Sequence, residues 1–179
     1  MSSITYLAVL SLLAATASAA SAAVAPTPHG APRGPATATE FLAVINAARA
    51  DARVLQLSWN ATVAQRANLH LSWLRTSAGC HLDKKDQYPI HDHMAGTFYR
   101  SGGSGRPAPV DVVAMWLDER RWYDRGANAC VTGKQCGDYM NVVNPEWRQL
   151  GCAMVACPSG QVVAACKYSP GAKGNKKRE

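Results

Sequence analysis

Three segments of the chain carry apolar residues at steps of three or four, and this pattern predicts amphipathic helices. The first follows Thr37 to Glu40 (TATE), which has the form of a capping box at a helix start. The second follows Asn60, a residue type favoured at N-caps, and the third opens at Pro109. The expected inward positions are Phe41, Val44, Ile45, Ala48, Ala52, Val63, Ala67, Leu71, Leu74, Val112, Met115 and Trp116.

The later part of the chain has the pattern of strands. QLGCAMVAC and QVVAACKY are strand-like and are separated by Pro158-Ser159-Gly160, a turn signal, so they predict a hairpin. The run CGDYMNVVN, from Cys136 to Asn144, also has strand character, whereas the glycine-rich AGTFYRSGGSGRPAP predicts a mobile surface loop. Helices first and an antiparallel hairpin last predict an α+β fold, with helices packed on a small sheet.

The two ends of the chain differ in composition from this folded part. Residues 1–19 have no charged side chain, an apolar core and a small-x-small end, which predicts a cleaved signal peptide; a disordered Ala-rich tail is the alternative. Residues 20–36 predict an Ala/Pro-rich linker, 37–170 a single domain, and 171–179 a basic flexible tail. The protein is therefore expected outside the cell, and no later stretch is long enough for a transmembrane segment.

The formal net charge of +7 lies entirely outside the predicted signal segment. Such a charge favours loose attraction to anionic surfaces such as membranes or cell-wall polymers. No basic helix and no module of stacking aromatic side chains occurs, so no nucleic acid partner is expected.

Six cysteines in a secreted chain predict disulfides, and the local pattern narrows their pairing. In a hairpin closed symmetrically about Ser159, Cys152 lies opposite Cys166, whereas Cys157 points to the other face. Cys130 and Cys136 bracket the short loop VTGKQ, which favours a local bridge between them. Cys80 is then left to pair with Cys157. The expected pairs are Cys80–Cys157, Cys130–Cys136 and Cys152–Cys166. A zinc site is disfavoured because no paired C-x-x-C spacing occurs.

Motifs between Phe41 and Tyr168 follow one known pattern. FLAVINAAR is similar to F-L-x-x-H-N-x-A-R, LSWN to L-x-W-N, and MWLDERRWYD to M-W-x-x-E-x-x-x-Y-D. CGDYMNVVN is similar to C-G-H-Y-T-Q-V-V-W, and LGCAMVAC with CKY to L-G-C-A-x-V-x-C with C-N-Y. In these motifs the chain resembles the pathogenesis-related class-one proteins of plants, within the superfamily of cysteine-rich secretory proteins and antigen 5. The resemblance implies a three-layer α-β-α sandwich and agrees with the cysteine pairing.

The resemblance also implies a central cleft, which in the family carries two histidines and two glutamates that can bind a divalent cation. Glu119, expected at the edge of the buried face of its helix, matches one glutamate. Thr97 stands where the family has the other glutamate, and Asp138 stands where it has a histidine. For the other histidine, CHLDK is similar to C-x-L-x-H and puts Lys84 at that position, whereas His91 or His93 falls near it if the chain carries an insertion there. The cleft of this chain is therefore expected to have altered chemistry.

A weak cation site is one hypothesis for this cleft. His93, Glu119 and Asp138 would supply one imidazole and two carboxylates, a set suited to a weakly bound divalent cation such as calcium or magnesium. The alternative, favoured by residue type, is that His91 and His93 lie in a solvated loop. No cofactor other than such a cation is expected.

The resemblance implies a secreted defence protein, located in the apoplast or cell wall, that binds a sterol, a lipid or another microbial ligand. Phe98 and Tyr99 either line an apolar groove for it or cover the core. The chain is expected to be a monomer. It is also expected not to be an enzyme, since G-x-S-x-G is absent and the cysteines are bridged. The alternatives are a metal-assisted hydrolase and a receptor-recognised signalling or structural variant. Asn60 also opens a glycosylation sequon.

Overall fold

The computed structural model describes residues 35–89 and 94–171. Within these residues, four strands form one sheet in the order β1-β5-β6-β2. The strands are β1 (Ser58–Trp59), β2 (Ala95–Arg100), β5 (Gln149–Ala156) and β6 (Val162–Ser169). The short strand β1 runs parallel to β5, and the other pairs are antiparallel, as expected for the β5–β6 hairpin. The predicted signal peptide, the basic tail after Gly171, and His91 and His93 lie outside the described residues.

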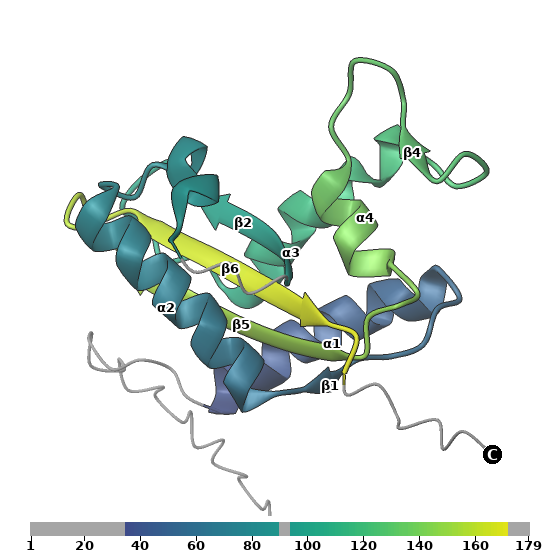
Figure 1. Cartoon of the computed structure of the whole chain (residues 1–179), viewed down its shortest axis with the longest axis horizontal. Coiled ribbons are helices and arrows are strands. Elements are labelled where there is room, and N and C mark those ends of the chain that lie inside the picture. Colours follow the sequence, from purple (N-terminus) through teal and green to yellow (C-terminus); the bar gives the residue numbers. More distant parts are fainter. Residues whose placement is uncertain (1–34, 90–93, 172–179) are drawn as a thin grey trace, which may run out of the picture. The chain divides into compact units, whose positions relative to one another are not determined.

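Helices cover both faces of this sheet (Figure 1). The helix α2 (Ala61–Ser77) packs on β5 and β6 from one side. The helices α1 (Pro35–Asp51), α3 (Pro109–Asp118) and α4 (Gly137–Val143) pack together on the other side. This arrangement is the three-layer α-β-α sandwich that the family resemblance implied.

The central strand β6 explains why two layers of helices are needed. All of its residues from Val162 to Tyr168 are buried, and its side chains alternate between two apolar clusters. Val163 and Ala165 join the cluster under α2, whereas Ala164 and Cys166 join the cluster under α1, α3 and α4. Because successive side chains of a strand point to opposite faces, a strand apolar on both faces must be covered twice.

The helix α2 begins and packs as the sequence predicted. The side-chain oxygen of Asn60 accepts hydrogen bonds from the backbone N–H groups of Thr62 (2.8 Å) and Val63 (3.2 Å). Its amide nitrogen, the atom that a glycan would modify, donates to Gln149 (3.0 Å). The predicted inward residues Val63, Ala67, Leu71 and Leu74 are all buried. Asn60 therefore caps the helix, and its glycosylation stays a prediction.

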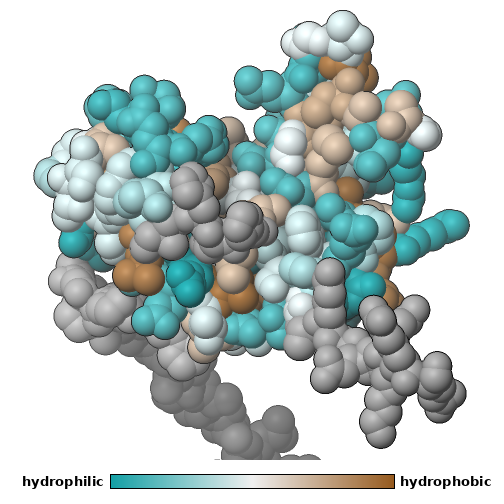
Figure 2. Space-filling model, viewed as in Figure 1, coloured by the Kyte–Doolittle hydropathy of each residue, from teal (hydrophilic) through white to brown (hydrophobic). Residues whose placement is uncertain are grey.

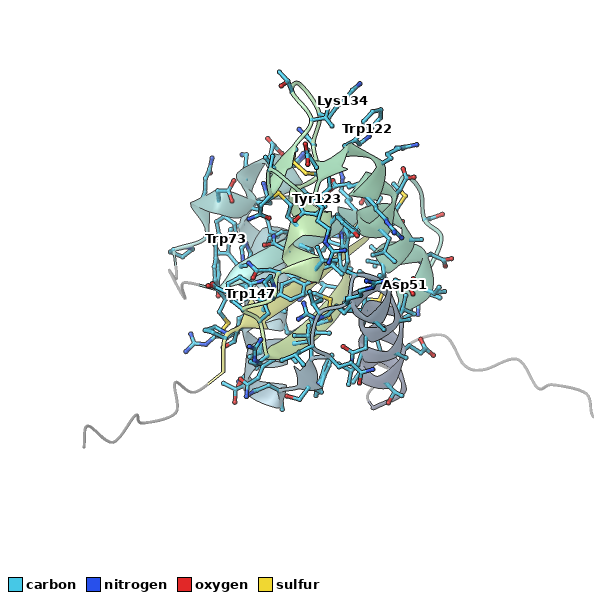
Figure 3. All side chains as sticks on the ribbon, turned by 90° about the vertical axis from the view of Figure 1, so that its right-hand side faces the viewer. Asp51, Trp73, Trp122, Tyr123, Lys134 and Trp147 are labelled. Atoms are coloured by element: carbon cyan, nitrogen blue, oxygen red, sulfur yellow. A yellow bond between two sulfur atoms is a disulfide. The ribbon has the colours of Figure 1, made fainter. Side chains whose placement is uncertain are left out.

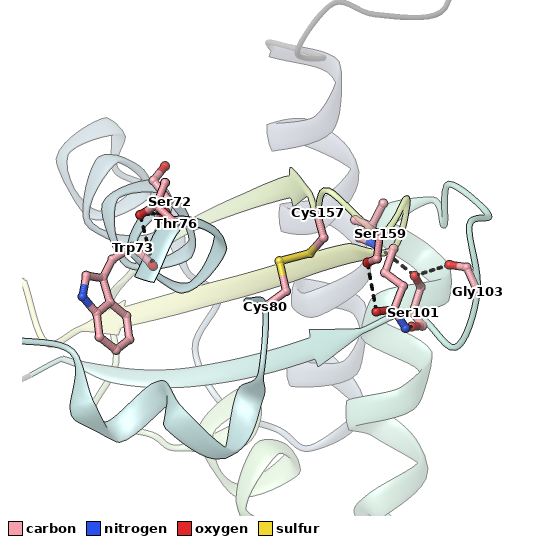
Figure 4. Close-up of a disulfide and its surroundings, with 10 residues drawn as sticks. Ser72, Trp73, Thr76, Cys80, Ser101, Gly103, Cys157 and Ser159 are labelled. Atoms are coloured by element: carbon pink, nitrogen blue, oxygen red, sulfur yellow. Dashed lines mark hydrogen bonds between the residues drawn. A yellow bond between two sulfur atoms is a disulfide. The ribbon is translucent and has the colours of Figure 1, made fainter. Parts of the chain in front are cut away.

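The three predicted disulfides are present: Cys80–Cys157, Cys130–Cys136 and Cys152–Cys166. Cys152 faces Cys166 in the β5–β6 register, as the symmetric hairpin required. Cys80, just after α2, reaches Cys157 beside the turn that carries Ser159 (Figure 4). This bridge closes a loop with a sequence separation of 77, and in the chain-entropy model a loop of that length stabilises the fold by about 4.5 kcal/mol.

Two predictions about the helices were wrong: the residue at which the first helix begins, and the set of residues that α3 buries. The first helix begins at Pro35, because proline is favoured at the first helical position, so Thr37 lies inside the helix and not at its cap. The residue Met115 is 61% exposed, whereas its neighbour Val113 is fully buried. The buried face of α3 therefore contains Val112 and Trp116, as predicted, but has Val113 in place of Met115.

Two segments have a different structure from the one that their sequence predicted. The run CGDYMNVVN forms the helix α4, in which Tyr139, Val142 and Val143 are buried at helical spacing. The residues Ala95–Arg100, predicted as part of a mobile loop, form β2 and pair with β6. In each case the local composition was outweighed by a tertiary partner.

Candidate functional site

A pocket of about 490 Å³ lies between five elements. These are the 3₁₀ helix η1 (Leu82–Gln87), the strand β2, the end of α3 with the 3₁₀ helix η2 (Glu119–Trp122), and the start of α4. Figure 2 shows the surface indented between the part over β2 and the part that carries α4 and the short strand β4 (Ala129–Cys130). The apolar walls are Leu82, Phe98, Tyr99, Met115 and Trp116, and the ionisable residues are Asp83, Arg100, Glu119 and Asp138.

The carboxylate of Glu119 is held in position by hydrogen bonds from the start of α4. Its atom Oε2 accepts hydrogen bonds from the backbone N–H groups of Asp138 (2.9 Å) and Tyr139 (3.2 Å). Those N–H groups belong to the first turn of α4, whose N-cap residue Cys136 makes no side-chain cap bond. Glu119 therefore caps α4 from another element, and this accounts for a carboxylate at the edge of an apolar helix face.

Asp138 lies in the same pocket with an altered acidity. Burial raises the pKa of the Asp138 carboxyl to about 7, with a further contribution from the nearby charge of Glu119. A hydrogen bond from the backbone of Phe98 and the charge of Lys85 act in the opposite direction. Near neutral pH this carboxyl is therefore partly protonated, and a ligand that brings positive charge would favour the ionised form.

We expect Asp138→Asn to be more stable than the wild type at pH 8, by about 1 to 3 kcal/mol, and nearly equal to it at pH 4. The folded protein keeps a proton on Asp138 that the unfolded chain loses above pH 3.8, so wild-type stability falls as the pH rises from about 4 to about 7. Urea unfolding at several pH values measures this difference. Asp118→Asn, an exposed acid paired with Arg121, serves as the control. Parallel pH profiles for wild type and Asp138→Asn would contradict the expectation.

The other residues that were predicted for the cleft are Thr97, His91 and His93. Thr97 is fully buried, lies 3.4 Å from the hydroxyl of Tyr168, and does not line the pocket. His91 and His93 are not among the described residues, so the proposed set of His93, Glu119 and Asp138 is untested. Within residues 35–89 and 94–171, no group of three or more His, Cys, Asp or Glu side chains is arranged to hold a metal ion.

Sequence reasoning missed several residues of the pocket and its support. Asp83 and Arg100 line the pocket, but the family motifs predicted no role for either residue. Arg49 is the last residue of the motif FLAVINAAR, and the sequence predicted no role for it. It is fully buried and donates to the carbonyl oxygens of Val142 (2.7 Å) and Asn144 (3.0 Å), at the C-terminal end of α4. An arginine within a helix motif becomes informative only once its distant partners are known.

A second, smaller pocket of about 390 Å³ lies near the C-terminal ends of α1 and α4. Asp51, Arg120, Tyr123 and Arg125 line part of it, and Figure 3 shows Asp51 and Tyr123 on the same side of the molecule. Above it, Lys134 lies 4.5 Å from the ring centroid of Trp122. This region combines cationic and aromatic side chains and lacks the acidic pair of the larger pocket.

The architecture defines a class of protein: a small α-β-α sandwich with three disulfides, of a kind that is stable in an oxidising, extracellular compartment. Residues 42–168 match the cysteine-rich secretory protein family, CAP, and the chain belongs to this family. No helix in the described part of the chain has the length and apolar character that crossing a membrane requires.

Curated relatives place the chain near the pathogenesis-related proteins of plants. It is 36% identical over 132 residues to pathogenesis-related protein 1B of Nicotiana tabacum, a match that covers 73% of each chain. It is 33% identical over 136 residues to pathogenesis-related protein 1 of Arabidopsis thaliana, covering 76% of each. These similarities support a pathogenesis-related defence protein.

Solved structures agree on the fold. Na-ASP-1 superposes with a TM-score of 0.61 at 18% identity, covering 82% of this chain and 41% of that one. MpPR-1i superposes with a TM-score of 0.54 at 16% identity, covering 79% of this chain and 96% of that one. At such identities the likeness concerns the fold alone.

Proposed function

We propose that this chain is a secreted defence protein of the apoplast or cell wall that binds a microbial sterol or lipid in the larger pocket and catalyses no reaction. The observation that carries the proposal is the set of apolar walls around a volume of about 490 Å³. Pockets of this size and lining are typical of sites for small apolar molecules. The walls come from Leu82, Phe98, Tyr99, Met115 and Trp116.

The arrangement of polar groups favours binding over catalysis. Among the described residues, the pocket lining contains no Ser, Cys or His that could act as a nucleophile or a base. Glu119 is engaged with two backbone N–H groups, which gives it a structural role at the start of α4. These features support a protein that holds its ligand unchanged.

A metal-assisted hydrolase is the second candidate, because the Asp138 carboxyl has a pKa of about 7 and such a group suits proton transfer at neutral pH. This candidate would use His93, Glu119 and Asp138 for a weakly bound divalent cation. It predicts hydrolysis of a broad peptide and ester panel in the presence of calcium, magnesium or zinc, and loss of that activity in Glu119→Gln. Silence across the panel with each ion would exclude it.

The binding proposal is tested by titrating the mature protein with a fluorescent sterol and a fluorescent fatty acid. Met115→Gln should weaken binding about fivefold, because it removes apolar surface from the pocket. Val110→Gln is the matched control, since Val110 is 52% exposed on the same helix but does not line the pocket. Neither change should alter stability strongly, because both side chains are exposed.

A second readout is the growth of a sterol-dependent microbe in the presence of the protein. We expect growth to slow and to recover when the same sterol is added in excess. No saturable binding of either probe, together with unchanged growth, would overturn the proposal.

A further inference from the structure

We propose that the ligand of the larger pocket carries a positively charged nitrogen next to its apolar body, and that Glu119 and Asp138 receive this ammonium group. The inference rests on the proposed binding function and narrows its ligand class: among sterols and lipids, those that carry an amine are bound more tightly than neutral ones. It depends on the charge of the pocket, the way in which Glu119 is held, and the nature of the walls.

The pocket is acidic in a protein that is basic. Asp83, Glu119 and Asp138 line it against one cation, Arg100, so three acids face one base there, whereas the whole chain carries a formal +7. Among the described residues, no Lys or Arg forms an ion pair with Glu119 or Asp138. The charge of Lys85 also acts on Asp138, but it is the smallest of the effects on the pKa of that carboxyl. Two neighbouring carboxylates without a direct ion-pair partner are costly, because like charges close together in a partly buried site oppose each other's ionisation.

The geometry of Glu119 prepares one acceptor for a ligand. Both of its backbone hydrogen bonds are made by Oε2, and neither uses Oε1. These two bonds fix the carboxylate in place without neutralising its charge. An ammonium group has three donors, and carboxylate oxygens are its strongest acceptors. Glu119 and Asp138 together can therefore receive one such group better than a hydroxyl.

The walls favour an organic cation over a metal ion. Tyr99 and Trp116 bring aromatic residues to the lining, and aromatic rings attract ammonium groups and also pack against hydrocarbon. A divalent ion such as calcium or magnesium instead requires about six or more oxygen ligands. The described part of the chain brings no three metal-binding side chains together. A neutral sterol would fill the walls but leave the two carboxylates uncompensated.

Three probes with the same apolar chain separate these cases: n-octylamine, 1-octanol and octanoate. Each is titrated calorimetrically into the mature protein at pH 7.5 with EDTA, at about 0.15 M salt, where the Debye length of about 8 Å suppresses the repulsion of a cation by the rest of the protein. We expect octylamine to bind about tenfold more tightly than octanol, because a hydrogen bond to a charged partner is stronger than a neutral one, and octanoate to bind most weakly.

The variants Asp138→Asn and Glu119→Gln should each bring the affinity for octylamine down toward that for octanol, without weakening octanol. In Glu119→Gln the new amide oxygen can still accept both bonds from α4, so that helix should persist, and circular dichroism checks it. If that variant nevertheless unfolds, Asp138→Asn alone carries the test. Asp118→Asn is the matched control, because Asp118 is adjacent in sequence, exposed and paired with Arg121. It should bind all three probes as the wild type does.

The possible failures are distinguishable. Equal affinities for octylamine and octanol would overturn the charge recognition and leave the proposed apolar binding intact. A preference for the amine that survives both pocket variants would overturn the assignment to Glu119 and Asp138. A divalent ion that binds the site more tightly than octylamine and excludes it, when EDTA is omitted, would also overturn the inference. If no probe and no sterol binds, the proposed function fails with it.

Discussion

Arg49→Met should lower the free energy of unfolding by about 3 to 5 kcal/mol, the largest effect that we expect of a single side-chain substitution in this protein. Arg49 is fully buried and donates to four backbone carbonyl oxygens, those of Leu55, Val142, Asn144 and Trp147. Methionine fills a similar volume but leaves these oxygens buried without a donor. Burial also lowers the pKa of the Arg49 guanidinium, so the buried charge is costly and depends on its hydrogen bonds to these carbonyl oxygens.

Urea unfolding under non-reducing conditions measures the change, with the midpoint expected to fall at a constant m-value. Arg75→Met is the control, because Arg75 is exposed in the last turn of α2, and it should change stability by less than about 0.5 kcal/mol. Arg49→Lys should lie between the two, since one ammonium can satisfy only part of the carbonyl set. An Arg49→Met variant within about 1 kcal/mol of the wild type would show that water replaces the guanidinium.

Substitution of Arg49 should also weaken ligand binding in the larger pocket. The carbonyl oxygens that it binds lie at the C-terminal end of α4, and the N-terminal end of this seven-residue helix carries Asp138. The two ends of α4 are thus held by residues from elsewhere, Arg49 at one and Glu119 at the other. Because Glu119 and Asp138 are placed by this helix, ligand binding should weaken together with stability.

The second large effect is expected for Gly151→Ala, with a loss of about 3 kcal/mol or more. A Cβ atom at Gly151 would lie 2.0 Å from the backbone nitrogen of Ala64 and 2.4 Å from the carbonyl carbon of Val63. These atoms belong to the first turn of α2, which rests directly on β5. Since backbone atoms cannot rotate away, the whole helix must shift and its contacts with Val163 and Ala165 loosen.

Unfolding of Gly151→Ala is compared with that of Gly102→Ala, where nothing lies within 4 Å of the new Cβ and little change is expected. The double variant Gly151→Ala with Ala64→Gly tests the cause. The clash is with backbone atoms, so removing the methyl group of Ala64 should give no rescue. A stability for Gly151→Ala equal to that of Gly102→Ala would mean that α2 does not approach β5 this closely.

Much of the framework followed from patterns within short stretches of sequence. The pairing of Cys152 with Cys166 depends only on a turn at Ser159 and on the alternation of side chains, so hairpin geometry was enough to predict it. The cap at Asn60 and the buried stripe of α2 are likewise local, because a helix places its own residues on one face. The family motifs placed Glu119 and Asp138 at one cleft, and the structure has both in one pocket.

The strand-like run that contains Asp138 shows where local reasoning stopped. Its valines and tyrosine suit a strand, yet it forms α4, because Glu119, 19 residues earlier, accepts its first N–H groups. The acidity of Asp138 arises in the same way from burial and from a neighbour on another element. Neither property can be deduced from the residues of the run alone.

The sequence by itself thus determined the family, the disulfide framework and the helical and hairpin elements whose pattern repeats locally. Only the tertiary structure decided that Arg49 binds carbonyl groups far along the chain, that Thr97 is buried beside Tyr168 and off the pocket lining, and that Met115 faces solvent at its rim. The physical reason is that periodicity specifies which face of an element is apolar, whereas hydrogen-bond partners and electrostatic surroundings depend on which elements meet in space.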